Sequence, residues 1–350
     1  MSINFELLKA LSEAPGIASR EDRVRAVAVE ALRPLVDDVQ FDALGNAIAT
    51  KKGKGSRRVM IAAHTDEIGF FVRYVDGRGF LRLHQVGGFD PRALFAQRVV
   101  VHTLRGPLTG TLMPGAKPPH LLAGEEAKPP KLDEFFVDLG LPESEVKEAV
   151  EIGDMVTLDR SCVRVGQNIV GKAMDDRVGV FVMIEAVRAL RSHEVDVLAV
   201  ATVQEEIGLR GAITSAYYLE PDIGIALDVT LAMDIPGTGE ADTISRLGAG
   251  AAIKIMDSSL ICDPRLVRDF RELARRHDIP VQLEVLPHGG TDAGSVQRSR
   301  AGVPSITLSI PCRYVHTVNE MVSESDVEAC INLLARFLEE AHQFSYQVTG

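Results

Sequence analysis

The sequence contains no tryptophan and few aromatic residues of any kind. Aromatic residues make up 5% of the 350 positions, which leaves little surface on which sugar rings could stack. This scarcity argues against a protein that recognises carbohydrate, including a glycoside hydrolase.

Cysteine is scarce as well. The four copies are Cys162, Cys262, Cys312 and Cys330, and no two of them form a Cys-x-x-Cys pair. Such usage fits reduced, buried thiols of a cytoplasmic protein better than a disulfide framework or a zinc knuckle.

Long apolar runs and an excess of positive charge are also missing. No stretch reaches about 18 uninterrupted apolar residues, and the first residues show no basic segment followed by an apolar one. The net charge of −11 disfavours nucleic acid or an anionic membrane as a partner. We therefore expect a soluble, cytoplasmic protein with neither kind of partner.

What the sequence does contain is an α/β pattern interrupted by a β-rich segment. A chain of 350 residues exceeds one typical hydrophobic core, so two domains are expected. Helix and strand patterns alternate in the first and last parts, whereas short β-like runs with Gly and Pro turns fill roughly residues 69–159. This organisation predicts a discontinuous α/β domain, residues 1–67 and 165–350, with an inserted β domain at 68–164.

Acids and histidines recur where predicted buried strands end or where a helix begins. The set comprises His64, Asp175, Asp176, Glu205, Glu206, Asp228 and His316. Each residue alone has a structural explanation as a helix cap, a turn former or a satisfied histidine. In open α/β sheets, however, binding sites form at the carboxyl ends of strands. Repetition at that end favours one shared site.

Two histidines and three carboxylates make a donor set suited to Zn²⁺, Co²⁺ or Mn²⁺. Two such ions carry four positive charges, which three carboxylates and one hydroxide balance. One zinc alone would take three protein ligands and water. Five ligands therefore indicate two ions that share a carboxylate.

The adjacent pair Glu205–Glu206 suggests a division of labour. One carboxylate can face the metals while its neighbour turns toward the metal-bound water and acts as a general base. Spacing alone does not say which glutamate has which role.

Several motifs, in one order, resemble those of a known enzyme family. They are AHTDEIGF, GKAMDDRVG, VQEEIGLRGA, LDVT, PHGGTDAG and RYVHT. Together they resemble the tetrahedral-aminopeptidase family of dinuclear metallopeptidases, which includes glutamyl- and leucyl-type aminopeptidases and some relatives labelled endoglucanases. The resemblance covers nearly the whole chain and implies a mixed-sheet, zinc-exopeptidase-like α/β domain with an inserted PDZ-like β-barrel.

The resemblance implies a metal ligand set. Asp175 would bridge two ions, and His64 and Asp228 would complete one site. Glu206 and His316 would complete the other.

It also implies the residues that act around the metals. Glu205 would be the general base, and Asp66 would orient the imidazole of His64. The peptide bond between Asp175 and Asp176 would be cis, as in related metallopeptidases.

Substrate binding and assembly follow from the same resemblance. Thr291 and Asp292 would line the pocket for the first side chain, although GGTD could equally be a tight turn. Arg313 would bind a substrate carboxylate or simply pair with a nearby acid. The β insert would join subunits into a tetrahedral homododecamer that admits short peptides.

The leading hypothesis is a metal-dependent aminopeptidase in which Glu205 activates a metal-bridging water. One alternative is an endoglucanase-type glycoside hydrolase that uses Glu205 with a second acid. That chemistry has no need of His64 or His316. A non-catalytic, metal-stabilised assembly subunit is a further alternative, and the intact Glu205 beside a full ligand set argues against it.

Overall fold

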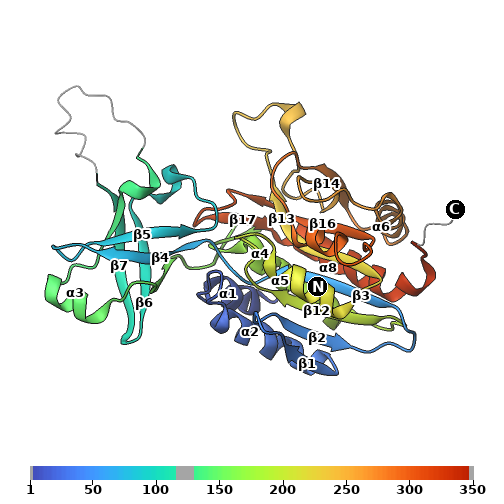
Figure 1. The fold of residues 1–350 in the computed structure, drawn as a ribbon. Coiled ribbons are helices and arrows are strands. Elements are labelled where there is room, and N and C mark those ends of the chain that lie inside the picture. The colour runs from blue at the N-terminus through green and yellow to red at the C-terminus, as the bar shows by residue number, and fades with distance from the viewer. Residues whose placement is uncertain (1–2, 116–129, 347–350) are drawn as a thin grey trace.

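Runs of small and β-branched residues build the centre of the fold. The computed structural model describes residues 3–115 and 130–346. The central strands are β12 (Asp196–Thr202), β3 (Arg58–His64), β13 (Ile223–Leu231) and β16 (Ser305–Arg313), in this order across the sheet (Figure 1). Each is parallel to the next. Their carboxyl ends therefore meet at one edge of the sheet.

Strand β3 is buried on both faces, as its apolar sequence predicts. Side chains alternate along a strand, so Val59, Ile61 and Ala63 join one hydrophobic cluster. Met60 and Ala62 join another, on the opposite face.

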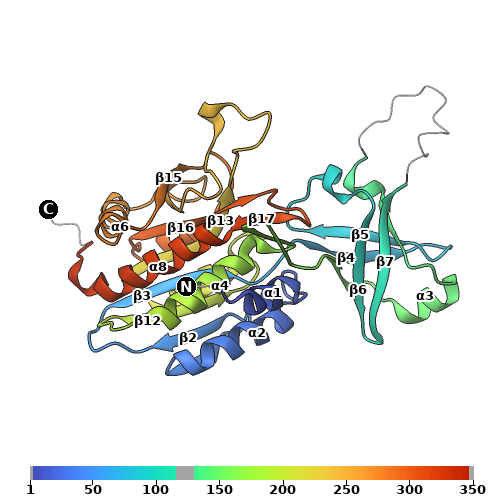
Figure 2. The same cartoon turned by 180° about the vertical axis from the view of Figure 1, so that it is seen from behind.

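Helices cover both faces of the sheet. On one face α4 (Met174–Ala189) and α8 (Glu324–Glu340) pack together, and Figure 2 shows them in front of the strands. On the other face lie α5 (Arg210–Leu219) and α7 (Asp292–Gln297). The remaining helices are α1 (Phe5–Glu13), α2 (Asp22–Leu32), α3 (Glu143–Ala149) and α6 (Pro264–Arg276). Within the described ranges, no helix has the length and apolar character needed to span a membrane.

The outer strands extend the sheet on both sides. Eleven strands of the described residues form it, in the order β1–β2–β12–β3–β13–β16–β17–β11–β10, with β14 beside β16 and β15 beside β14. Their bounds are β1 (Asp38–Phe41), β2 (Ala47–Lys51), β10 (Val163–Val165), β11 (Asn168–Gly171), β14 (Ala251–Met256), β15 (Val281–Val285) and β17 (Glu320–Ser323).

A second β structure stands beside this sheet. Strands β4 (Gly69–Val75), β5 (Leu81–Val86), β6 (Gln97–Thr103), β7 (Gly106–Pro114), β8 (Phe135–Asp138) and β9 (Met155–Leu158) close into an antiparallel barrel. The barrel has its own hydrophobic core. The predicted fold class, α/β with an inserted β-barrel, is confirmed. The barrel strands lie within 68–164, while the division into domains at those boundaries stays a prediction.

The carboxyl edge of the sheet differs from the prediction at Asp228. The sequence predicts a strand that ends before this residue, whereas β13 continues to Leu231. The reason is that β16 pairs with β13 as far as Leu231, opposite Cys312. On the other side, β3 pairs with β13 only as far as Ala226. Asp228 therefore lies beyond the end of the β3 ladder.

Candidate active site

The strand-end residues line one cavity at the carboxyl edge of the sheet. Its volume is about 570 Å³, and its polar lining includes His64, Asp175, Glu205, Glu206, Asp228 and His316. His64 is the last residue of β3, and Asp175 lies at the start of α4. The tertiary structure thus brings together every predicted metal ligand and the predicted base.

Asp175 lies between the two histidines. Its Oδ1 is 3.0 Å from Nε2 of His64, and its Oδ2 is 3.3 Å from Nε2 of His316. Nε2 of His316 is in turn 3.5 Å from Oε1 of Glu206. The two oxygens of one carboxylate therefore face different partners, which is the arrangement a bridging ligand requires.

The donor atoms are close enough together to hold metal ions. Ligand atoms of His64, Asp175 and Glu206 lie within 4.8 Å of one another, and so do those of His64, Glu205 and Asp228. Imidazole and carboxylate donors suit Zn²⁺, Co²⁺ or Mn²⁺, so the residues fit the implied ions. Glu205 belongs to the second group, so its carboxylate lies next to the atoms that would bind an ion.

The electrostatics of the cavity call for cations. Burial raises the pKa of Glu205 well above its usual value, and the nearby carboxylates of Asp228 and Glu206 raise it further. Burial and Asp175 do the same to the pKa of Asp228. Burial alone would lower the pKa of His64, but Glu205 and Asp175 raise it well above its ordinary range. Buried acids this close repel one another unless positive charge is bound between them.

Asp66 holds both the histidine and the glutamate pair. Its backbone oxygen lies 3.0 Å from Nδ1 of His64, and its carboxylate Oδ1 lies 3.6 Å from the same atom. A proton on Nδ1 leaves Nε2 free to bind a metal. The two carboxylate oxygens accept hydrogen bonds from the backbone N–H groups of Glu205 (3.0 Å) and Glu206 (3.1 Å). The resemblance implies a role for Asp66 beside His64, which stays a prediction, whereas its bonds to the glutamate pair were not expected.

Glu320, at the start of β17, is a site residue that sequence reasoning missed. Its carboxylate accepts hydrogen bonds from the backbone N–H groups of Asp175 (3.1 Å) and His316 (2.7 Å). Burial, followed by the charge of Asp175, raises its pKa to about 8. A single acid before the apolar residues of a strand was the available signal.

Asp176 lies outside the cavity lining and binds the backbone next to it. The peptide bond between Asp175 and Asp176 is cis. The carboxylate of Asp176 accepts hydrogen bonds from the backbone N–H groups of His64 (3.2 Å) and Gly179 (3.1 Å). A Cβ on Gly179 would lie 2.6 Å from Cγ of Asp176, so a larger residue there must displace this carboxylate.

The three predicted substrate-binding residues differ in position. Thr291 lines the cavity. Asp292 is buried outside the lining and accepts a hydrogen bond of 2.5 Å from Thr202. Arg313 is also outside it and binds Asp234 through two contacts of 3.0 and 2.6 Å.

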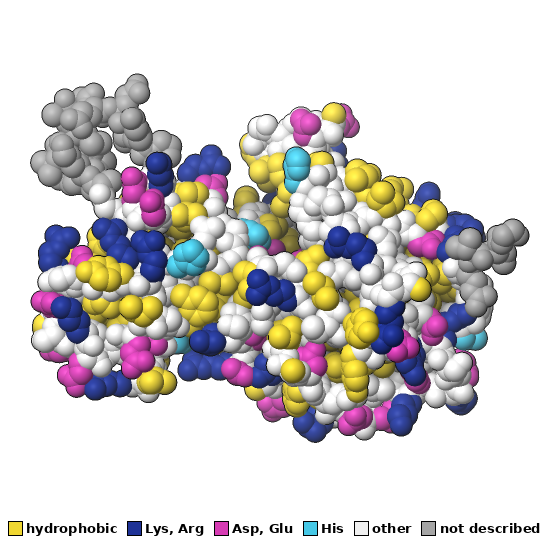
Figure 3. Space-filling view, viewed as in Figure 1, with side chains coloured by type: hydrophobic (Ala, Val, Ile, Leu, Met, Phe, Trp, Pro, Cys, Tyr) yellow, Lys and Arg dark blue, Asp and Glu magenta, His cyan; other side chains and the backbone are white. Residues whose placement is uncertain are grey.

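The barrel reaches the edge of the site. The surface is hollowed between the barrel and the rest of the molecule (Figure 3). In the loop after β5, a Cβ on Gly87 would lie 3.1 Å from Oε2 of Glu206, and one on Gly88 would lie 3.4 Å from Nδ1 of His316. The barrel loop thus approaches two predicted ligands, and it is tight at Gly87, where a Cβ would also lie 2.6 Å from Cγ2 of Ile68.

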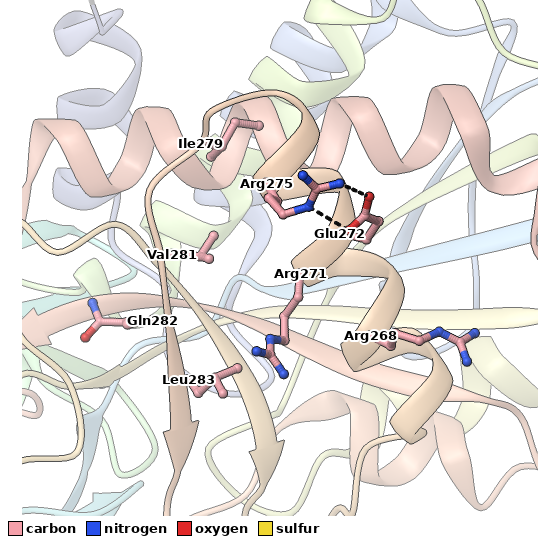
Figure 4. A pocket seen from close by; sticks show the side chains of 8 residues that line it. All are labelled: Arg268, Arg271, Glu272, Arg275, Ile279, Val281, Gln282 and Leu283. Atoms are coloured by element: carbon pink, nitrogen blue, oxygen red, sulfur yellow. Dashed lines mark hydrogen bonds and ion pairs between the residues drawn. The ribbon is translucent and has the colours of Figure 1, made fainter.

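A second cavity, of about 620 Å³, lies between α6 and β15 (Figure 4). Three arginines, Arg268, Arg271 and Arg275, line it beside the apolar side chains of Val281 and Leu283. Among the described residues that line it, Glu272 is the single carboxylate, and it is bound to Arg275. These lining residues therefore include no set of metal ligands.

Comparisons with known proteins point to one family. The profile of the family described as M42 glutamyl aminopeptidase matches residues 45–333. A putative aminopeptidase of Acetivibrio thermocellus is 38% identical over 94% of this chain and 97% of its own. The solved structure of an aminopeptidase from Desulfurococcus kamchatkensis has a TM-score of 0.92 at 41% identity, covering 96% of this chain and 94% of that one.

A third relative carries information on assembly. The TET1 peptidase of Pyrococcus horikoshii can assemble into a tetrahedron or a large octahedral shell. Its structure has a TM-score of 0.85 at 33% identity and covers 96% of this chain and 99% of that one.

Proposed function

This chain belongs to the M42 glutamyl aminopeptidase family, and we propose that it is a dinuclear metallo-aminopeptidase that removes N-terminal residues from short peptides. Membership makes it a hydrolase of peptide bonds. The metal arrangement, the role of each residue and the substrate are the proposal.

The position of Asp175 is the observation that carries the proposal. Its oxygens face His64 on one side and His316 on the other, at 3.0 and 3.3 Å. Asp175 and Asp228 are buried, the side chain of Glu206 is 6% exposed, and none of the described residues lining the cavity is a lysine or arginine. Buried acids of this kind carry their charges when cations are bound between them, which supports metal binding.

We assign one ion to His64, Asp175 and Asp228, and the other to Asp175, Glu206 and His316. Zn²⁺ and Co²⁺ suit these donors best, and Mn²⁺ is a further candidate. When bound, the ions would polarise the scissile carbonyl and lower the pKa of water toward about 7.

Glu205 is the general base in this proposal. Its Oε2 lies 3.9 Å from Nε2 of His64, so the carboxylate borders the metal-binding atoms. It takes a proton from the attacking water and passes it to the leaving amine. Asp66 holds Glu205 in place through the backbone N–H bond of 3.0 Å.

We also propose that residues 68–164 form the domain through which subunits associate, giving a tetrahedral homododecamer. The assembly of the Pyrococcus horikoshii relative supports this. Light scattering of the metal-loaded protein should show a dodecamer, and a monomer at working concentration would contradict it.

The four cysteines are buried and unpaired, which supports a location in the reducing cytoplasm.

The test of the catalytic proposal is a panel of aminoacyl-p-nitroanilides assayed before and after chelation. We expect hydrolysis that disappears with the metal and returns when Zn²⁺, Co²⁺ or Mn²⁺ is added. Carboxymethylcellulose serves as the control for a glycoside hydrolase and should stay intact. Full activity with metal content confirmed as zero would overturn the proposal.

A further inference from the structure

The wall of the active-site cavity next to the acids is apolar. Its apolar lining consists of Leu209, Val229, Leu231, Leu286 and Val315. They come from the segment after Glu206, from β13, and from the segments that follow β15 and β16. Apolar side chains from separate parts of the chain thus line the same cavity as the acids, and we call these five residues the apolar wall.

Apart from the predicted ligands His64 and His316, the basic side chain in the described lining is the exposed imidazole of His288. Among the described residues, none that line it is lysine or arginine. Lys254 on β14 is the cation behind the wall, and it is fully buried. Its Nζ lies 2.7 Å from Oε1 of Glu284 and 3.7 Å from Oδ2 of Asp257. Two acids therefore outweigh this one positive charge.

Arg313 does not supply the missing charge either. Its guanidinium group is held by the carboxylate of Asp234, and it is not part of the lining. An acidic substrate side chain would therefore find neither a lysine nor an arginine among the described lining residues.

A basic side chain lacks a free acid in the same way. The acids in the described lining are Asp175, Glu205, Glu206 and Asp228. All four serve as metal ligands or as the base in the proposed function. Glu284 and Asp257 lie behind the wall, fully buried beside Lys254.

The hydroxyl groups of the wall are already used. Oγ1 of Thr230 donates to Oε1 of Glu284 at 2.6 Å. Oγ1 of Thr291 lies 3.2 Å from Oδ2 of Asp257, to which it donates, and 2.8 Å from Oγ1 of Thr307. These threonines therefore have little capacity to bind a polar side chain.

From this lining we propose that the apolar wall receives the first side chain of the substrate, and that the enzyme prefers peptides beginning with an uncharged aliphatic residue such as leucine. The inference rests on the proposed aminopeptidase function. It gives this chain a preference that differs from the glutamyl activity in the name of its family.

The preference can be measured with leucyl-, alanyl-, lysyl- and glutamyl-p-nitroanilide on the metal-loaded enzyme. We expect kcat/KM for leucine to exceed that for alanine by at least about 10- to 200-fold, the effect of one methylene group, because alanine lacks the branched end that would contact the wall. Lysine and glutamate should both fall below leucine, because each would bring a charge against the apolar wall without an oppositely charged partner. A glutamyl or lysyl substrate that is hydrolysed faster than the leucyl one would overturn the inference.

Leu231 allows a sharper test. It is half-buried at the end of β13, three residues or about 10 Å along the strand from Asp228. Leu231→Lys should raise the ratio of glutamyl to leucyl kcat/KM by about 10-fold or more, while Leu231→Glu should lower it. The ratio does not depend on how much enzyme is active, so partial metal loss leaves it unchanged. Val315→Lys repeats the test if Leu231→Lys does not fold.

Leu283→Lys is the matched control. Leu283 lies on β15 with 43% of its surface exposed and faces the other cavity, between α6 and β15. The same charge placed there should leave the substrate ratio unchanged. The apolar wall would not determine the substrate preference if Leu283→Lys shifted the ratio equally. The same conclusion would follow if the folded Leu231→Lys and Val315→Lys variants left the ratio unchanged. Loss of hydrolysis of every substrate by the metal-loaded wild type would instead contradict the proposed function.

Discussion

Replacing Glu205 or Glu206 by glutamine makes the same chemical change at adjacent positions, yet we expect the two variants to fail differently. Oε2 of Glu205 lies 3.9 Å from Nε2 of His64, whereas Oε1 of Glu206 lies 3.5 Å from Nε2 of His316. Both backbone N–H groups donate to Asp66. Neither substitution alters the backbone, so the local turn should be retained in both variants.

Glu205→Gln keeps the shape of the side chain but cannot take a proton. Loss of a general base lowers kcat by about 10²- to 10⁴-fold, which corresponds to about 2.7–5.4 kcal/mol in the barrier. Because the proposed ligands are unchanged, the variant should still bind two metal ions.

Glu206→Gln removes one negative charge from a ligand set that just balances two dications and a hydroxide. The metal site at His316 should weaken selectively, by about 10- to 100-fold or more in affinity. Much of the lost activity should therefore return at high metal concentration. Excess metal should do nothing for Glu205→Gln.

The assay is metal content and kcat for both variants across a Zn²⁺ or Co²⁺ titration. Glu145→Gln, an exposed glutamate on α3, controls for loss of one negative charge. Rescue of Glu205→Gln but not of Glu206→Gln would reverse the assignment. Full activity in both variants would place the active site elsewhere.

Three further predictions concern the residues around the site and the barrel. Glu320→Leu removes the carboxylate that accepts hydrogen bonds from two backbone N–H groups. The free energy of unfolding, measured by urea titration, should fall by about 2 kcal/mol or more. Gly179→Ala forces a Cβ against the carboxylate of Asp176 and should lower the free energy of unfolding by about 1–3 kcal/mol. An unchanged midpoint of the urea titration would contradict the close contact between Gly179 and Asp176. Burial, with Arg23 and Lys172 nearby, lowers the pKa of His102 from 6.5 to about 4, so the folded protein binds this proton less readily than the unfolded chain. Stability should fall as pH drops from about 6.5 toward about 4, and His102→Gln should lose less stability over this range; an identical pH profile would exclude His102 as the cause.

Local sequence was sufficient for much of the fold. The apolar run that ends at His64 indicates a strand buried on both faces, and β3 alternates between two hydrophobic clusters as expected. The change of pattern after residue 68 indicates a β insert, and the barrel strands lie there. Both signals are properties of neighbouring residues, because side-chain alternation and turn formation act over a few positions.

Asp228 shows where local reasoning fails. The end of a strand depends on how far its neighbours pair with it, and those neighbours are distant in the sequence. β16 pairs with β13 beyond Asp228, while β3 stops pairing before it. Sequence reasoning therefore placed the residue at a strand end, although it lies inside a strand.

The sequence by itself determined which chemical groups are available: two histidines, their neighbouring acids and the adjacent glutamate pair, placed near strand ends by local hydrophobic patterns. Only the tertiary structure decided which atoms face one another. It set the oxygens of Asp175 between His64 and His316, placed Glu320 behind both, and gathered an apolar wall that includes Leu231 and Leu286. The physical reason is that these contacts join strands and loops far apart in the chain, and their relative positions follow from strand order and packing rather than from local sequence.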